Sequence, residues 1–237
     1  MNRIDSYEDL AEQIVNWIKD YYWDNDLGGL VVGVSGGIDS AVVSTLCART
    51  GLPTYVLTMP LDSNKQNTEL SDAHAEFLKK KYPNVVHYDI DLSEPYHKLI
   101  STIGLNTAPS GFTTNRTLIT DNLTNANTKS RMRMVTLYQI AGVVKGIVVG
   151  TGNKVEDYGV GFYTKYGEYL EVDERICEAP PTDGLWEDSR TDEEQLGASY
   201  EQLEEAMETG AGSGLAVLEK FNKQNKHKMD PIPTFKL

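Results

Sequence analysis

The sequence has few cysteines, few basic residues and no long apolar run, and each shortage excludes a class of protein. Two cysteines, Cys47 and Cys177, occur among 237 residues, too few for a disulfide framework or a cysteine-rich metal site. No stretch reaches membrane-spanning length, and the N-terminus MNRIDSYEDL lacks the apolar segment of a secretion signal. We therefore expect a cytoplasmic protein with Cys47 in its core.

Basic residues are outnumbered, because 22 Lys and Arg stand against 35 Asp and Glu, for a formal net charge of −13. Such a surface repels nucleic acids and anionic membranes, so we expect neither as a partner. A small polyanionic ligand needs only a local positive pocket and is compatible with this charge. With 40% hydrophobic residues, the chain has the composition of one globular domain with a substantial core.

Helix and strand patterns alternate along the chain. Short apolar runs rich in β-branched residues predict strands, and amphipathic patterns predict helices between them. The expected strands are 30–32, 55–59, 84–90 and 146–151. This alternation predicts an α/β fold, a doubly wound and mostly parallel sheet with helices on both faces. In such a sheet ligands bind beyond the carboxyl ends of the strands.

The most informative stretch is LVVGVSGGIDS, which joins the first strand to the next helix. Its small residues let phosphate oxygens approach the backbone, and the helix dipole favours negative charge. Neither the Walker loop nor the dinucleotide fingerprint has an acid at the position of Asp39, where the helix begins. This acid indicates that a metal ion binds together with the phosphates. An ordinary strand-to-helix turn is the alternative, but it needs fewer small residues.

Other polar segments suit a ligand less specifically. Arg131 and Arg133 in NTKSRMRMVTLY have guanidinium forks suited to phosphate or carboxylate, although an exposed basic turn is equally compatible. Glu156 could complete a metal site with Asp39, and Lys165 could meet a ligand phosphate, but surface positions would explain both.

The histidines of the first half carry no metal-binding pattern. They fall inside predicted helices or strands without ligand spacing, so we interpret them as structural. These residues are His74, His87 and His97.

SGGIDS resembles the pyrophosphate-binding loop of the ATP-pyrophosphatases, and other motifs narrow the resemblance to the NAD synthetases. These motifs are NTKSRMRMVTLY, GTGNKVEDYGVGFYTKYG, PPTDGLWEDSRTDEEQLG and HKMDPIP. The resemblance implies an adenine nucleotide α-hydrolase-like fold, a homodimer, and ATP-dependent ligation of ammonia to deamido-NAD through an adenylated carboxylate. Residues 1–32 leave no room for a glutamine-hydrolysing domain, so we expect a single ammonia-dependent domain over residues 1–237.

The resemblance also assigns site residues. Those implied to bind ATP are Gly33, Val34, Ser35, Gly36, Gly37, Ile38, Asp39, Ser40, Thr151 and Thr182. Those implied to bind deamido-NAD are Arg131, Lys165, His227 and Lys228. Asp39 and Glu156 match the Mg²⁺ ligands. No general base is assigned, because such catalysis rests mainly on positioning and electrostatics.

The chain departs from the family pattern at two places. Thr58 stands where an Arg often contacts ATP, which puts that contact in doubt. After Gly167 the chain runs directly into Glu168, where the family has a further loop and helix of about twenty residues by ordinary element lengths. Either the protein has lost this segment, with an Asp and a Lys that contact substrates, or the sequence omits a mobile lid. We favour the omitted lid, since lids are commonly disordered without substrate.

Two other functional classes stay open from the sequence. A tRNA-thiolating ATP-pyrophosphatase would need a basic RNA-binding surface and reactive cysteines, and the charge of −13 disfavours it. A non-catalytic nucleotide-binding protein on the same fold becomes a serious alternative only if the segment after Gly167 is truly lost.

Overall fold

The computed structural model describes residues 6–63, 65–105, 122–152, 172–177, 193 and 196–221. The chain divides into two compact units. The larger unit comprises Met1–Thr151 and Tyr163–Ser189, and the smaller one comprises Gly152–Phe162 and Arg190–Leu237.

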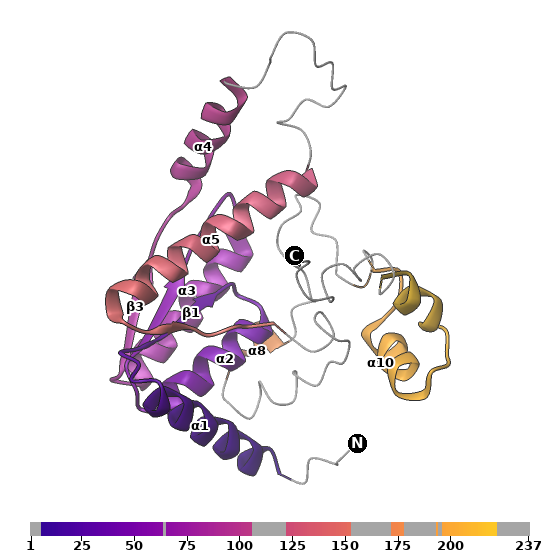
Figure 1. Ribbon diagram of the computed structural model, residues 1–237, viewed down its shortest axis with the longest axis horizontal. Coiled ribbons are helices and arrows are strands. Elements are labelled where there is room, and N and C mark those ends of the chain that lie inside the picture. Colours follow the sequence, from indigo (N-terminus) through magenta and orange to yellow (C-terminus); the bar gives the residue numbers. More distant parts are fainter. Residues whose placement is uncertain are drawn as a thin grey trace, which may run out of the picture. The chain divides into compact units, whose positions relative to one another are not determined.

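The larger unit alternates helices and strands, as the sequence predicted (Figure 1). The elements in chain order are α1 (Tyr7–Asp24), β1 (Leu30–Val34), α2 (Ile38–Arg49), β2 (Thr54–Thr58), α3 (Lys65–Lys81), β3 (Val85–Asp89), α4 (Ser93–Leu105), α5 (Asn122–Val144), β4 (Ile147–Val148) and α8 (Glu174–Cys177). The strands form one sheet in the order β3-β2-β1-β4, and every pair is parallel. The predicted α/β class is therefore confirmed.

Strand β1 is the centre of this sheet. It pairs with β2 from Leu30↔Thr54 to Val34↔Thr58, and on its other side Leu30 pairs with Ile147. After β3 the chain crosses over to place β4 beside β1, so the strand order reverses between β1 and β4. Ligands of doubly wound sheets bind at such a reversal.

Successive β1 side chains point to opposite sides of the sheet, and those of Leu30, Val31 and Val32 are all apolar and buried. Helices therefore cover both faces of the sheet. Leu30 and Val32 pack in a core cluster with α1 and α2, which includes the fully buried Cys47. Val31 packs in a second cluster with residues of α4 and α5. Burial raises the pKa of the Cys47 thiol to about 12, so this residue is the inert core cysteine that the sequence predicted.

Helix α5 runs antiparallel to β1 across the sheet. Its C-terminal end adjoins the start of β1, where the Gly28 amide donates to the carbonyl of Lys145 at 2.8 Å. Farther along, a Cβ on Gly33 would lie 3.4 Å from Cδ1 of Leu137. The N-terminal half of α5 must therefore lie at the carboxyl edge of the sheet.

The smaller unit contains α10 (Tyr200–Thr209). Ser199 and Gln202 form a reciprocal capping box at its start, and Gly210 ends it with φ of 66°, as a left-handed C-terminal glycine commonly does. No helix in the described ranges combines the length and the apolar character needed to cross a membrane.

His74 joins α3 to α2 inside the larger unit. Both His74 and Ser44 are fully buried, and the His74 Nε2 lies 3.0 Å from the Ser44 Oγ. The His74 Nδ1 has no partner among the described residues. Burial lowers the pKa of His74 to about 4, because the buried site disfavours the charged imidazolium. His74 is therefore structural, as the sequence indicated.

We predict that this histidine makes the fold sensitive to acid. The unfolded chain takes up a proton on His74 below its ordinary pKa of about 6.5, whereas the folded protein does so only near 4. Stability is therefore fully present above pH 6.5 and falls as the pH drops toward 4, by about 2 kcal/mol between pH 7 and pH 5.

Urea unfolding at pH 7 and pH 5 measures this loss. His74→Gln should remove about 2 kcal/mol of the pH dependence. An unchanged pH slope in His74→Gln would contradict the assignment.

Candidate active site

The turn between β1 and α2 requires glycine at position 36. Gly36 has φ of 85°, and a Cβ there would lie 2.6 Å from the backbone oxygen of Asn67 at the start of α3. Both the left-handed backbone and the close approach exclude other residues. The turn is therefore seated directly against α3.

Two serine hydroxyls brace this turn from within. The Ser40 Oγ accepts from the Ser35 amide at 3.1 Å and donates to the Gly37 carbonyl at 2.9 Å. The Ser35 Oγ accepts from the Gly37 amide at 3.3 Å. Ser40 is only 3% exposed, so the structure gives its hydroxyl a role inside the loop. Direct contact of that hydroxyl with pyrophosphate stays a prediction.

Helix α2 begins in a way that suits an anion. None of the described side chains caps its start at Gly37, whereas the side chain of Ser6 caps α1. A ligand oxygen can take the place of the missing cap, because first-turn amides point outward and the helix dipole favours negative charge. The turn can thus hold phosphate with backbone groups.

Asp39 lies in the first turn of α2. Its carboxylate supplies the hard oxygen donor that Mg²⁺ prefers, and this chemistry fits the metal implied by the sequence. Glu156, its expected partner, lies outside the described residues. Within the described ranges, no group of three or more His, Cys, Asp or Glu side chains is placed to hold a metal ion.

Thr151 lies at the same edge of the sheet as the phosphate turn. It comes after β4, whereas the turn comes after β1, and these strands are parallel neighbours. Carboxyl ends of parallel strands meet at one edge. The structure therefore brings together the two parts of the predicted ATP site that it describes.

The two arginines of α5 differ in their surroundings. Arg131 is exposed, and its Nη1 donates to the Asn127 carbonyl of the same helix at 2.9 Å. Arg133 is part-buried, and it donates from Nε to the Met59 carbonyl at 3.1 Å and from Nη2 to the Ser63 Oγ at 3.2 Å. Arg131 is thus exposed on the helix surface, and its contact with deamido-NAD stays a prediction, whereas Arg133 faces the segment after β2.

The side chain of Thr58 is buried and its hydroxyl is occupied within the sheet. It is fully buried at the end of β2, with its hydroxyl 3.0 Å from the His87 Nε2 and 3.3 Å from the Asp89 Oδ1 that it donates to. The side chain joins β2 to β3 and carries no charge. The structure therefore supports the doubt raised by the sequence at this position.

The remaining predicted residues lie outside the described part of the chain, so their roles stay predictions. They are Glu156, Lys165, Thr182, His227 and Lys228, together with the Gly167–Glu168 junction.

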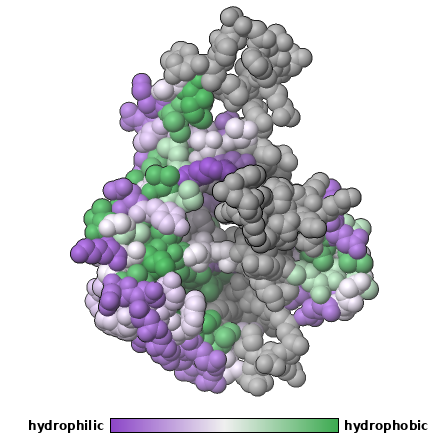
Figure 2. Space-filling view, in the orientation of Figure 1, coloured by the Kyte–Doolittle hydropathy of each residue, from purple (hydrophilic) through white to green (hydrophobic). Residues whose placement is uncertain are grey.

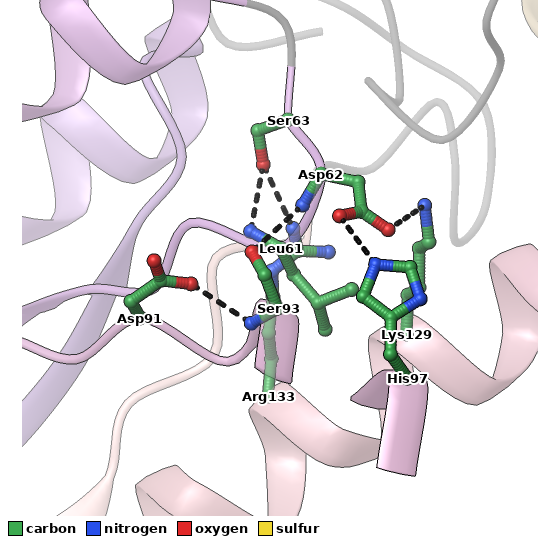
Figure 3. A network of polar contacts seen from close by, with 8 residues as sticks. All are labelled: Leu61, Asp62, Ser63, Asp91, Ser93, His97, Lys129 and Arg133. Carbon is green, nitrogen blue, oxygen red and sulfur yellow. Dashed lines mark hydrogen bonds and ion pairs between the residues drawn. The ribbon is translucent and has the colours of Figure 1, made fainter. Parts of the chain in front are cut away.

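A polar network that the sequence did not reveal surrounds Asp62, just after β2 (Figure 3). Asp62 has a left-handed φ of 49°. Its Oδ1 lies 3.0 Å from the His97 Nε2 of α4, and its Oδ2 lies 3.6 Å from the Lys129 Nζ of α5. The Lys129 Nζ also lies 5.2 Å from the ring centroid of Tyr96. The polar run 62–67 predicted a loop there, but no local pattern indicates partners on distant helices.

These features can be compared with known proteins. The model of the NAD synthase family matches residues 10–170. The chain belongs to this family. It is 33% identical, over 94% of its length and 95% of the relative, to an NH(3)-dependent NAD(+) synthetase of Carboxydothermus hydrogenoformans. It is 30% identical, over 83% of its length and 81% of the relative, to one of Mycoplasma genitalium.

Solved structures agree with this assignment. An NMN synthetase from Francisella tularensis superposes with a TM-score of 0.83 at 27% identity, covering 98% of this chain and 99% of that one. An NH3-dependent NAD synthetase from Campylobacter jejuni superposes with a TM-score of 0.68 at 23% identity, covering 98% and 99%. At that identity the second likeness shows the shared fold alone.

The alignment of this chain with the Carboxydothermus NAD synthetase contains more positions than this chain has aligned residues. It spans 248 positions, whereas 94% of the chain's 237 residues take part, so about 25 positions have no residue here. The family match ends at residue 170, close to the Gly167–Glu168 junction. Both observations are in keeping with the short junction noted in the sequence.

We predict that Gly36→Ala destroys the phosphate turn, whereas Gly51→Ala is a matched control. Gly51 has a similar φ of 74°, but its Cβ would meet nothing within 4 Å. Both variants therefore incur the backbone cost of about 1 kcal/mol, and only Gly36→Ala also meets the Asn67 carbonyl.

Calorimetric titration with ATP separates the two variants. Gly36→Ala should weaken ATP binding by at least about tenfold, and Gly51→Ala should bind as the wild type does. Equal binding by both variants would show that the turn does not hold the nucleotide.

Proposed function

We propose that this protein is an ammonia-dependent NAD synthetase, a ligase that amidates deamido-NAD at the expense of ATP. The observation that carries the proposal is the uncapped glycine turn after β1 in a chain of the NAD synthase family. The curated relatives are NH(3)-dependent NAD(+) synthetases along nearly the whole chain, which supports ammonia as the nitrogen donor.

The chemistry requires activation of a carboxylate. The nicotinate carboxylate is a poor acylating group, so one of its oxygens attacks the α-phosphorus of ATP and pyrophosphate leaves. Ammonia then attacks the carbonyl carbon of this adenylate, the carbon–oxygen bond to AMP breaks, and the amide forms after loss of a proton. In this proposal the first-turn amides of α2 hold the pyrophosphate end, and the exposed Arg131 binds the dinucleotide. Most of the rate gain comes from positioning and charge stabilisation.

Magnesium is part of this proposal. Asp39 and Glu156 would hold the ion, whose positive charge offsets the charge that builds on the leaving pyrophosphate. Asp39 lies at the phosphate turn itself, where a metal bound with ATP would be needed. The cytoplasmic location expected from the sequence likewise stays a prediction.

A second substrate is a specific alternative. The superposition on an NMN synthetase, with a TM-score of 0.83 over 98% of the chain, favours a mononucleotide acceptor. An enzyme of that kind would amidate nicotinate mononucleotide by the same adenylation steps. The fold and the phosphate turn suit adenylation of deamido-NAD and of nicotinate mononucleotide equally. Other residues of the site must therefore select between the dinucleotide and the mononucleotide.

One assay tests the function and the acceptor together. AMP formation from ATP is measured with ammonia and either deamido-NAD or nicotinate mononucleotide, and we expect faster turnover with deamido-NAD. Asp39→Asn should reduce turnover by about a hundredfold or more, while Asp20→Asn, on the exposed side of α1, should leave it unchanged. Failure of both acids to support AMP formation would refute the proposal, and a preference for the mononucleotide would establish the alternative.

We further propose that the protein is a homodimer that pairs through α5. The outer side of this helix exposes large apolar residues, in contrast to the usual polar outer face. They are Met134, Val135, Tyr138 and Val143, with exposures of 48%, 62%, 62% and 69%. Exposed apolar residues continue at Leu99 and Ile103 of α4, and apolar groups gather on the face drawn in Figure 2. A second copy of the chain would cover such a surface.

We predict that Val135→Glu converts the dimer to a monomer, because it buries two charges at the symmetric interface. Trp17→Glu is the control, since Trp17 is equally exposed at 67% on α1. Sedimentation velocity measures the change. A wild-type monomer, or a dimer that survives Val135→Glu, would exclude pairing through α5.

A further inference from the structure

The segment between β2 and α3 is fixed by a guanidinium from α5. Arg133 donates from Nε to the Met59 carbonyl and from Nη2 to the Ser63 Oγ, at 3.1 and 3.2 Å. The Ser63 Oγ in turn accepts from the Leu61 amide at 3.2 Å. Figure 3 draws the contacts of Arg133 with this serine. One side chain therefore holds both ends of residues 59–63.

Arg133 carries its charge without an acid partner in the described part of the chain. Asp62, which lies in the segment that Arg133 holds, is bound instead by His97 and Lys129. Burial lowers the pKa of Arg133, and none of the carboxylates in the described ranges offsets this effect. Placing an uncompensated cation in a part-buried position costs free energy, so packing alone does not account for an arginine here.

The segment that Arg133 holds borders the phosphate turn. A Cβ on Gly33 would lie 3.3 Å from the Met59 Cε, so the end of β2 touches the strand that leads into the turn. Residues 59–63 then continue into α3, whose Asn67 carbonyl lies against Gly36. A shift of this segment would therefore move the surface on which the phosphate turn is seated.

The shape of the guanidinium matches this task. Its fork reaches two acceptors that lie four residues apart in the chain, one on the backbone and one on a side chain. A lysine amine has equal charge but is a single point donor. An amide side chain such as Gln has no charge and a single donor nitrogen.

We propose that Arg133 is a positioning residue for ATP: it fixes Met59 and Ser63 and thereby holds the α3 surface against which the phosphate turn is seated. The proposal rests on the ATP-dependent function above. Arg133 acts through the loop and differs in this from Arg131, whose side chain is exposed on α5. Loss of Arg133 should weaken ATP binding and leave the deamido-NAD site largely unaffected.

The test measures ATP binding by titration calorimetry, which needs no turnover, and then the KM values for both nucleotides. Arg133→Gln should weaken ATP binding about tenfold or more and raise the KM for ATP in parallel. The KM for deamido-NAD should stay within about twofold. Arg133→Lys should recover only part of the loss. Arg49→Gln is the matched control, because Arg49 lies at the C-terminal end of α2, away from the phosphate turn, and pairs with Glu12 of α1.

Ser63→Ala provides an independent arm that does not depend on folding of the arginine variant. It removes one acceptor and should weaken ATP binding about threefold. The double variant should lose less ATP binding than the two single losses combined, since both changes remove the shared contact between Arg133 and Ser63.

ATP binding within about twofold of the wild type in Arg133→Gln, with a lowered unfolding temperature, would reduce Arg133 to a structural role and overturn the proposal. A rise confined to the KM for deamido-NAD would also overturn it. If the wild type binds ATP but forms no AMP with either acid, the proposed function fails while the positioning role is still measured by calorimetry.

Discussion

The parallel pairing of β1 with both β2 and β4 is the constraint on which the rest of the structure depends. It makes β1 a strand buried on both faces, and it directs three carboxyl ends toward one edge of the sheet. The phosphate turn, Met59 and Thr151 come together there although they are far apart in the sequence. Because β4 joins on the other side of β1, the edge also contains the strand reversal at which doubly wound sheets bind ligands.

The N-terminal half of helix α5 also lies at this edge, on the face of the sheet opposite to α1 and α2. Its packing from Val144 beside Gly29 to Leu137 beside Gly33 leaves the helix N-terminal half at the carboxyl edge. That half carries the exposed Arg131, whereas Lys129 pairs with Asp62 and Arg133 donates to Met59 and Ser63. The helix dipole adds positive charge at its start. A protein with a net charge of −13 can therefore still offer a local positive region to ATP, because fields close to a site depend on nearby groups.

Much of this arrangement could be predicted from local patterns. The strand before SGGIDS, the following helix and the alternating order required only the period of apolar residues and the small residues at the turn. The network around Asp62 could not be predicted, because His97 and Lys129 reach it through helix packing that no local pattern encodes. The difference between Arg131 and Arg133 was hidden for the same reason: two residues apart on a helix, they point in directions that only the sheet distinguishes.

The short junction at Gly167–Glu168 gives these packing contacts more weight. About 25 positions of the alignment with the Carboxydothermus relative have no residue in this chain. A chain that lacks a covering segment has fewer groups with which to order ATP, so the ordering must come from parts already rigid in the fold. The β2–α3 segment is such a part, because Arg133 fixes it from α5 and the Asp62 contacts fix it from both α4 and α5. The same contacts would serve a chain with a complete lid, since a lid can close productively only over a nucleotide that is already positioned.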